Sequence, residues 1–96
     1  MRQRNFRIHL AAVIAVSTLG ALAGLSRLEW LAITLSCGLV ISAEAMNTAV
    51  ELVCDAVTRE HNPVIGQAKD VAAGAVLLAA ICACVVGATV FWGHLP

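Results

Sequence analysis

Charged side chains are scarce in this sequence. Lysine, arginine, aspartate and glutamate make up 12% of the 96 residues, whereas 60% are hydrophobic and the mean hydropathy is +0.89. A globular domain carries about 25% charged residues, which argues against a soluble monomer, a disordered tail and a secreted mini-protein. The net charge is zero, so nothing in the composition suggests nucleic-acid binding by a basic surface. This composition is typical of a membrane protein.

Several motifs of soluble enzymes are also absent. The sequence contains no P-loop of the GxxxxGK[ST] type, no GxGxxG and no zinc signature. Its cysteines lie within apolar runs and form no C-x-x-C pair; they are Cys37, Cys54, Cys82 and Cys84. We interpret them as small apolar packing residues, with a disulfide or a metal site as the alternative.

Three long apolar runs occupy most of the chain. Because about 20 apolar residues in a helix cross a hydrocarbon core, they predict a single-domain, all-α membrane protein over residues 1–96. The expected spans are about 8–26, 30–52 and 70–93. The expected loop on the cytoplasmic side is about 56–68. The short connection Arg27–Leu28–Glu29 fits an antiparallel helix pair.

The first apolar run has an alternative interpretation. Arg2, Arg4 and Arg7 precede a stretch that ends in Ala21–Leu22–Ala23, which imitates a signal peptide with its cleavage site. The signal-peptide interpretation is opposed by the segment after this stretch, which leads directly into the next expected helix through Gly24–Leu25–Ser26.

Basic residues gather at one end of the expected helices. Five of the six share this end, namely Arg2, Arg4, Arg7, Arg59 and Lys69. The positive-inside rule then places the N-terminus of the expected multi-pass membrane protein in the cytoplasm. Only Arg27 lies on the outer side, where Trp30 and Trp92 would occupy the interface that such rings prefer.

One face of the expected second helix carries a polar stripe. Its members fall within an arc of about 80° at 100° per residue; they are Glu44, Asn47, Glu51 and Asp55. Three carboxylates on one face repel each other and are costly near lipid, so we expect a positive group beside them. A helix end that projects into water is the alternative. It accounts for Asp55 better than for Glu44, which lies about 16 Å deeper along the axis.

Lys69 and Asp70 are expected to open the third helix. A helix N-terminus favours anions, and a lysine there adds a full positive charge. Together with the carboxylates they predict a Mg²⁺–nucleotide site, because Mg²⁺ usually takes one or two carboxylates plus substrate phosphates. A snorkelling lysine beside a helix-capping aspartate is the alternative.

A stripe of small residues follows the expected third helix. Ala75, Ala79, Ala83 and Gly87 recur every four residues, which lets another helix approach closely. Three thin helices enclose little space, so we expect the working protein to be an oligomer.

The order of residues Glu44–Asp55 and Ala68–Val76 resembles the prokaryotic diacylglycerol kinase family, including its undecaprenol kinase branch. The shared pattern is E-x-x-N-[ST]-A-[IV]-E-x-x-x-D, followed at a fixed distance by A-K-D, and Asn5–His9 is similar to the segment before the family's first span. The resemblance implies a lipid kinase that transfers the γ-phosphate of MgATP to the hydroxyl of diacylglycerol or undecaprenol. It also implies a homotrimeric helical bundle with active sites shared between neighbouring subunits.

The resemblance implies a role for each matched residue on the second helix. Glu44 would be the catalytic base and Asn47 the polar residue that supports it. Glu51 would hold the Mg²⁺ of MgATP, and Asp55 would be a further acid of the motif.

Nucleotide contacts are implied for the following loop and the third helix. Lys69 would lie on the phosphates, beside Asp70. The loop residues with the same implied role are Glu60, His61 and Asn62.

Two departures from the family leave other functions open. Gln3 stands where relatives carry a second Mg²⁺-binding glutamate, and the family's amphipathic helix would lie ahead of Met1. One alternative is therefore a catalytically degenerate, N-terminally truncated relative that acts only as an oligomeric membrane protein. Another is a small ion transporter that uses Glu44 and Glu51 as a relay. The residues do not fix the acceptor lipid, although Ala73–Leu77 is more similar to the undecaprenol branch.

Overall fold

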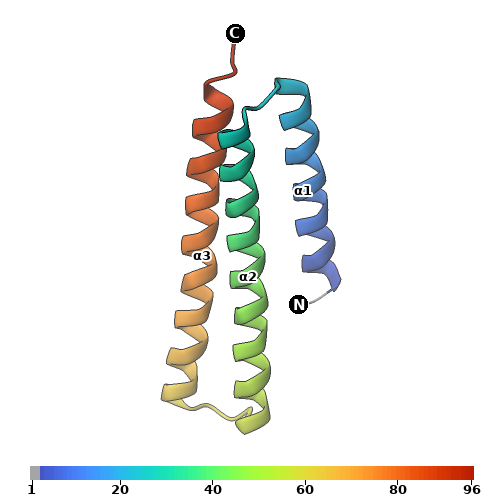
Figure 1. The fold of residues 1–96 in the computed structure, drawn as a ribbon. Helices are drawn as coiled ribbons and strands as arrows, with labels where there is room; N and C mark the ends of the chain where they lie inside the picture. Colours follow the sequence, from blue (N-terminus) through green and yellow to red (C-terminus); the bar gives the residue numbers. More distant parts are fainter. Residues whose placement is uncertain (1–2) are drawn as a thin grey trace.

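The computed structural model describes residues 3–96 as three α-helices joined by short connections (Figure 1). The helices are α1 Gln3–Ala23, α2 Arg27–Val57 and α3 Pro63–Trp92. Each is long and apolar enough to cross a membrane. The prediction of an all-α chain with three helices of membrane length is therefore confirmed.

The two longer helices extend beyond the thickness of a membrane core. With 31 and 30 residues, α2 and α3 are each about 45 Å long at 1.5 Å per residue. A hydrocarbon core is about 30 Å thick, so about 15 Å of each helix reaches into the interface or beyond. The polar ends of these helices are thus accommodated without breaking them.

An antiparallel hairpin of α2 and α3 forms the body of the molecule. The two helices pack along their length, whereas α1 lies to one side and makes few contacts with α2 (Figure 1). On α3, Ala79 is buried and Ala83 and Gly87 are half-buried, whereas Ala75 is exposed. Of the predicted small-residue stripe only Ala79 is therefore fully buried in this fold, and no atom of another described segment lies within 4 Å of a Cβ built on Gly87.

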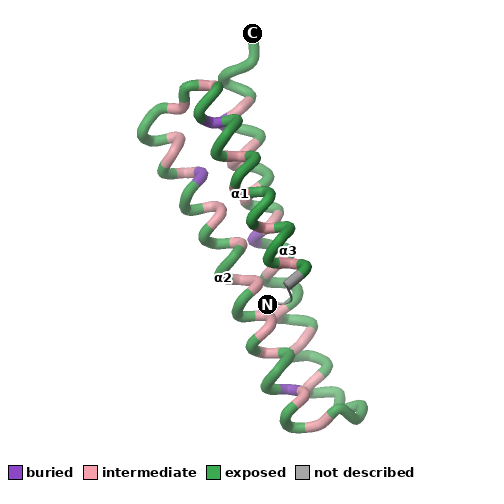
Figure 2. Tube along the Cα trace, turned by 90° about the vertical axis from the view of Figure 1, so that its right-hand side faces the viewer, coloured by how far each residue is buried: buried purple, intermediate pink, exposed green. Residues whose placement is uncertain are grey.

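Most apolar side chains of the described residues face outward (Figure 2). Leu22, Leu28 and Trp92 are 81%, 75% and 76% exposed, and similar residues occur on all three helices. Exposed apolar surface on this scale needs lipid or another protein surface to cover it. The fold is therefore suited to a bilayer.

The first connection has three residues, as the sequence predicted, but it lies at residues 24–26 instead of 27–29. Ser26 caps α2 through a capping box: its Oγ accepts from the Glu29 backbone N–H at 3.2 Å, and the Glu29 carboxylate accepts from the Ser26 N–H at 3.0 Å. The expected loop Arg27–Leu28–Glu29 is thus the first turn of α2, and Ser26 does not belong to the first helix. Gly24 makes the turn between the helices with a positive φ of 73°.

The second connection, residues 58–62, is shorter than the expected loop at 56–68. Asn62 caps α3 with its Oδ1, which accepts from the N–H groups of Val64 and Ile65 at 3.0 and 3.2 Å. Pro63 follows at the first helical position, where its missing N–H carries no cost. Because α3 starts here, Lys69 lies in its second turn, and the prediction that Lys69 and Asp70 open the helix is wrong.

A glycine sets the closest approach of α1 to α2. A Cβ atom built on the buried Gly20 would lie 2.7 Å from the Cη2 atom of Trp30. The indole therefore occupies the space that any larger residue at position 20 would need. This contact lies near the end where the chain passes from α1 to α2, opposite the loop at residues 58–62 (Figure 1).

Candidate functional site

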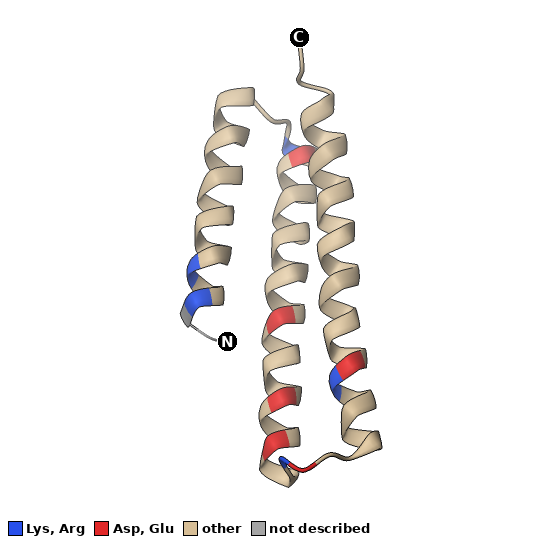
Figure 3. Ribbon diagram, turned by 180° about the vertical axis from the view of Figure 1, so that it is seen from behind, with Lys and Arg blue, Asp and Glu red and all other residues tan. Residues whose placement is uncertain are grey.

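A polar cleft opens on the half of α2 that lies nearer the loop at residues 58–62. We call this end of the α2–α3 hairpin the loop end. Its volume is about 490 Å³, and its lining residues are Asn5, Glu44, Asn47, Thr48, Glu51, Leu52 and Asp55. Figure 3 shows the acidic residues of this half following one another along α2. The structure thus brings all four members of the predicted stripe to one cleft, with Asn5 of α1 on its wall.

Among the cleft residues of α2, Glu44 lies farthest from the loop at residues 58–62. Its side chain contacts a histidine of α1. Its Oε1 lies 3.6 Å from the Nε2 of His9, and the two side chains are 19% and 20% exposed. The sequence predicted a positive group beside the stripe but did not identify His9. An ionisable residue within a membrane-length helix was the signal that could have found it.

Asn47 and Glu51 form a pair within α2, one turn apart. The Asn47 Nδ2 donates to the Glu51 Oε1 at 3.2 Å. The Oδ1 of Asn47 is buried and has no hydrogen-bond partner among the described residues. Asn47 thereby orients Glu51, which is exposed to the cleft, and it keeps one acceptor unused.

Lys69 of α3 does not line the cleft, but it contacts one of the residues that do. Its Nζ donates to the Asp55 Oδ1 at 2.8 Å, and both side chains are 39% exposed. An ammonium group has three donors, so donors remain for a further anion. Lys69 therefore lies beside the carboxylates as the sequence predicted, although its charge does not coincide with the helix N-terminus. Asp70 is exposed and does not line this cleft.

The loop residues proposed for the nucleotide lie at the loop end without lining the cleft. Glu60, His61 and Asn62 are all exposed. The Asn62 side chain is engaged as the cap of α3, and the Glu60 N–H donates to the Thr58 Oγ1 at 3.0 Å. The structure thus assigns Asn62 a structural task that the sequence analysis did not recognise.

The donor set of the cleft suits a magnesium ion that arrives with a nucleotide. Among residues 3–96 no group of three or more histidine, cysteine, aspartate or glutamate side chains could hold a metal ion alone. Mg²⁺ normally needs only one or two carboxylates, with phosphates and waters as its other ligands. The exposed carboxylate of Glu51 meets that requirement. The side chain of Gln3, at the departure from the family pattern, lies outside the described residues, as does Arg2.

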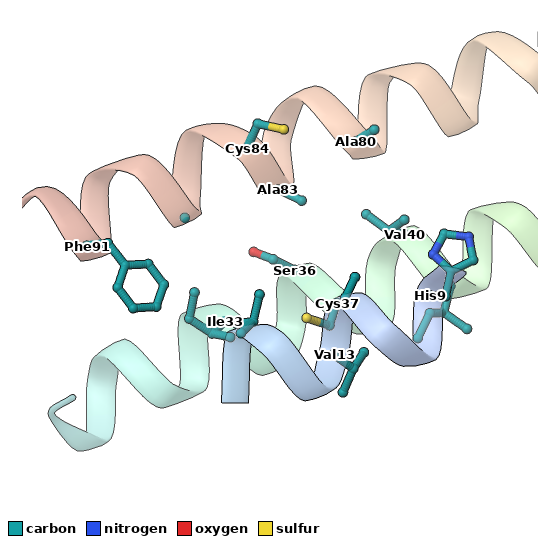
Figure 4. A pocket seen from close by; sticks show the side chains of 14 residues that line it. His9, Val13, Ile33, Ser36, Cys37, Val40, Ala80, Ala83, Cys84 and Phe91 are labelled. Atoms are coloured by element: carbon teal, nitrogen blue, oxygen red, sulfur yellow. The ribbon is translucent and has the colours of Figure 1, made fainter. Parts of the chain in front are cut away.

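A second, apolar cavity of about 330 Å³ lies between the three helices. Figure 4 shows His9 at one end of it and Phe91 at the other, with Val13, Ile33 and Ala83 between them. Ser36 also lines this cavity, but its hydroxyl donates to the Ala32 carbonyl at 2.8 Å. The cavity therefore offers hydrocarbon contacts along most of its length, and His9 lies between it and Glu44.

Another cross-helix pair closes the end of the hairpin opposite the loop. The His94 Nε2 lies 2.9 and 3.0 Å from the two carboxylate oxygens of Glu29. Glu29 is also the acid of the capping box, so both of its interactions fix helix ends. This end of the hairpin thus uses its polar groups for structure.

The four cysteines are free thiols in the structure. Cys54 is buried, Cys37 is half-buried, and Cys82 and Cys84 are exposed on α3. None of them belongs to a group that could hold a metal ion within residues 3–96.

Comparison with known proteins agrees with the motif. The model of the prokaryotic diacylglycerol kinase family matches residues 1–91. The chain belongs to this family. The resemblance found in the stripe of α2 and in the A-K-D segment is thereby confirmed.

Individual relatives carry the names of two lipid kinases. Undecaprenol kinase of Bacillus subtilis (strain 168) is 44% identical over 89 residues, which are 93% of this chain and 72% of the relative. Diacylglycerol kinase of Synechocystis sp. is 45% identical over 86 residues, or 88% of this chain and 49% of the relative. Diacylglycerol kinase of Escherichia coli (strain K12) is 38% identical over 56 residues, which are 58% of this chain and 46% of the relative. The chain thus belongs to a family of membrane lipid kinases and spans about half the length of two of these relatives.

Proposed function

We propose that this protein is an ATP-dependent lipid kinase, which transfers the γ-phosphate of MgATP to the hydroxyl of diacylglycerol or undecaprenol. The observation that supports it best is the position of Glu44. This carboxylate lines the polar cleft and lies 3.6 Å from His9, which lines the apolar cavity. This position supports the proposal that a water-soluble donor and a lipid acceptor meet at Glu44.

The two spaces suit the two substrates. The cleft carries oxygen ligands, and the remaining donors of Lys69 lie beside it through the contact with Asp55; together they match a metal-bound triphosphate. The cavity is lined mainly by aliphatic groups and has little to offer a phosphate. In our proposal the nucleotide enters from the loop end and the hydrocarbon part of the acceptor lies along the cavity.

Phosphoryl transfer depends mainly on positioning and on neutralising charge. Glu44 would take the proton from the acceptor hydroxyl, whose oxygen then bonds to the γ-phosphorus while the bond from that phosphorus to the β-phosphate oxygen breaks. ADP leaves and the lipid phosphate remains. Lys69 would neutralise charge on the phosphates, Asp55 would hold Lys69 in place, and Asn47 would orient Glu51.

Magnesium would be held by Glu51 together with phosphate oxygens. The ion would supply Lewis-acid neutralisation of the transferred group. The additional nucleotide contacts that we propose are Asp70, Glu60, His61 and Asn62.

The proposed topology places the loop end in the cytoplasm, in the inner membrane. The start of α1 and the loop at residues 58–62 lie toward the same end of the molecule (Figure 1), and Arg4, Arg7 and Arg59 belong to these two segments (Figure 3). The positive-inside rule supports this orientation. We further propose a homotrimer, because all three helices keep exposed apolar faces and the cleft is open on one side.

Transfer of labelled γ-phosphate from MgATP in mixed micelles tests this function. Diacylglycerol and undecaprenol are offered in parallel to the purified protein, and Glu44→Gln serves as the matched inactive variant. Label in either lipid with the native protein alone supports the proposal and identifies the acceptor. No label in either lipid, from protein shown to be helical and homogeneous, overturns it and leaves a degenerate relative.

A further inference from the structure

We propose that His9 is a positioning residue for Glu44. Its Nε2 lies 3.6 Å from the Glu44 carboxylate, and in our proposal it donates to that carboxylate once the acceptor is bound and holds it at the junction of the polar cleft and the apolar cavity. This inference rests on the proposed kinase function. It assigns a task to a residue of α1, whereas the other side chains given a role in the proposed phosphoryl transfer belong to α2, α3 or their connection.

The contact between His9 and Glu44 differs from the other ion pairs of the described residues. Those pairs, Asp55–Lys69 and Glu29–His94, join elements of the hairpin near its two ends. His9 instead connects α1 to the middle of α2, although α1 otherwise makes few contacts with that helix. The pair is thus placed at the stripe of carboxylates rather than at a helix end.

The depth of the pair makes a purely solvated role unsuitable. Glu44 lies 13 residues before Val57, the last residue of α2, which is about 20 Å along the axis. Both side chains are only about one-fifth exposed. Ionisable groups at such depth are costly and usually pair with one another, so Glu44 needs a donor, and His9 is the ionisable side chain that lies within 4 Å of it in the described part of the chain.

His9 also determines which space the carboxylate faces. The imidazole lines the apolar cavity, and Glu44 lines the cleft on the other side of the contact. A glutamate has several side-chain rotamers, and a fixed donor on one side selects among them. The His9 ring thereby aims Glu44 at the boundary between the two spaces, where a lipid hydroxyl would lie.

The separation of 3.6 Å is longer than a hydrogen bond. Catalytic contacts are often long in the absence of substrate and shorten when the complex forms. The effect of His9 should therefore appear in turnover with the lipid acceptor bound, rather than in the affinity for MgATP.

Two substitutions separate the donor from the mere presence of a polar group. His9→Gln can place an amide N–H near the position of Nε2, whereas the shorter His9→Asn cannot. His9→Leu removes the donor and keeps an apolar side chain. Ser17→Leu, at an exposed position of α1 outside the cavity lining, is the matched control for a leucine on this helix.

We expect His9→Leu and His9→Asn to lower kcat by about 10- to 100-fold, the range for residues that orient a reacting group. The KM for MgATP should change by less than about twofold, because the interaction belongs to the acceptor step. His9→Gln should retain kcat within about threefold of the native protein, and Ser17→Leu should be unchanged. The measurement is steady-state transfer of label to the preferred lipid, with circular dichroism as the check of folding.

A double substitution tests whether His9 acts through Glu44. In Glu44→Asp the carboxylate is one methylene shorter and retracts from His9. Adding His9→Leu to this variant should lower kcat by less than about twofold, because coupled residues are not additive. A full additional 10- to 100-fold loss would show that His9 acts elsewhere.

The outcomes distinguish this inference from the function on which it rests. If the native protein labels no lipid, the proposed function fails and this inference fails with it. If the native protein is active, four results overturn the inference alone: full activity of His9→Leu and His9→Asn, an equal loss in His9→Gln and His9→Asn, a change in the KM for MgATP without a change in kcat, or a full additional loss in the double substitution. If His9→Leu does not fold, the comparison of kcat between His9→Gln and His9→Asn decides whether the inference holds.

Discussion

The two ends of the α2–α3 hairpin use similar ion pairs in different surroundings. At the end opposite the loop, Glu29 contacts His94 at 2.9 Å and also completes the capping box with Ser26. At the loop end, Asp55 contacts Lys69 at 2.8 Å. Beyond that second pair, Glu51, Asn47 and Glu44 continue along α2 toward the middle of the molecule.

The difference lies in how many polar groups are needed to hold the helices together. One carboxylate, one hydroxyl and one imidazole suffice to fix the end opposite the loop. The loop end has two further carboxylates and an amide whose buried oxygen has no partner among the described residues. Polar groups in a membrane-length helix lower its stability in lipid, so this surplus indicates a site that binds or reacts.

The largest expected effect is at the deepest carboxylate. Glu44→Gln keeps the shape of the side chain but cannot accept a proton as a carboxylate does. Turnover of the lipid should fall by about 10²- to 10⁴-fold, the usual contribution of a general base. Nucleotide binding should be nearly intact, which titration with MgATP can measure. Wild-type turnover in this variant would remove Glu44 from the mechanism.

The next effect compares two glutamates at the two ends. Glu51→Gln should raise the KM for MgATP by about tenfold or more, because a neutral amide is a weaker ligand for a hard cation. Glu29→Gln is the matched control at the opposite end and should leave that KM unchanged. Steady-state kinetics at varied MgATP would show the contrast. Equal effects of the two substitutions would mean that the ends do not differ in function.

A stability effect is expected where α1 approaches α2. Gly20→Ala places a methyl group 2.7 Å from the Trp30 ring, and overpacking of this kind costs about 1–3 kcal/mol. Gly38→Ala is the control, because nothing lies within 4 Å of its Cβ position. Thermal unfolding in micelles, followed by circular dichroism, should separate the two variants. Similar midpoints would indicate that Trp30 moves aside without cost.

The smallest effect concerns the capping box. Ser26→Ala removes the Oγ acceptor at the start of α2 and should lower stability by about 0.5–2 kcal/mol. Turnover should not change, because the cap lies at the structural end of the hairpin. Ser17→Ala, at an exposed position within α1, provides the comparison in the same unfolding experiment. A loss of turnover in Ser26→Ala without loss of stability would connect that end to the chemistry.

Hydrophobic run lengths were enough to predict three helices, and spacing was enough to predict the stripe on α2. The residues at which helices begin and end were harder to predict, because capping depends on side-chain geometry. Because of the capping box at Ser26, the expected loop at residues 27–29 is the first turn of α2. Because Asn62 caps α3 and Pro63 follows it, α3 begins six residues before Lys69. His9 was missed because nothing in one sequence states which face of α1 lies against α2.

The five-residue connection between α2 and α3 has a consequence for how the protein is made. Asp55 and Lys69 are only 14 positions apart in the chain, so their contact closes a short loop, which is fast and costs little entropy. It can form as soon as the second turn of α3 emerges during synthesis. The nucleotide half of the proposed site would then be assembled by local contacts alone. The lipid half must wait until α3 has been completed and inserted beside α1.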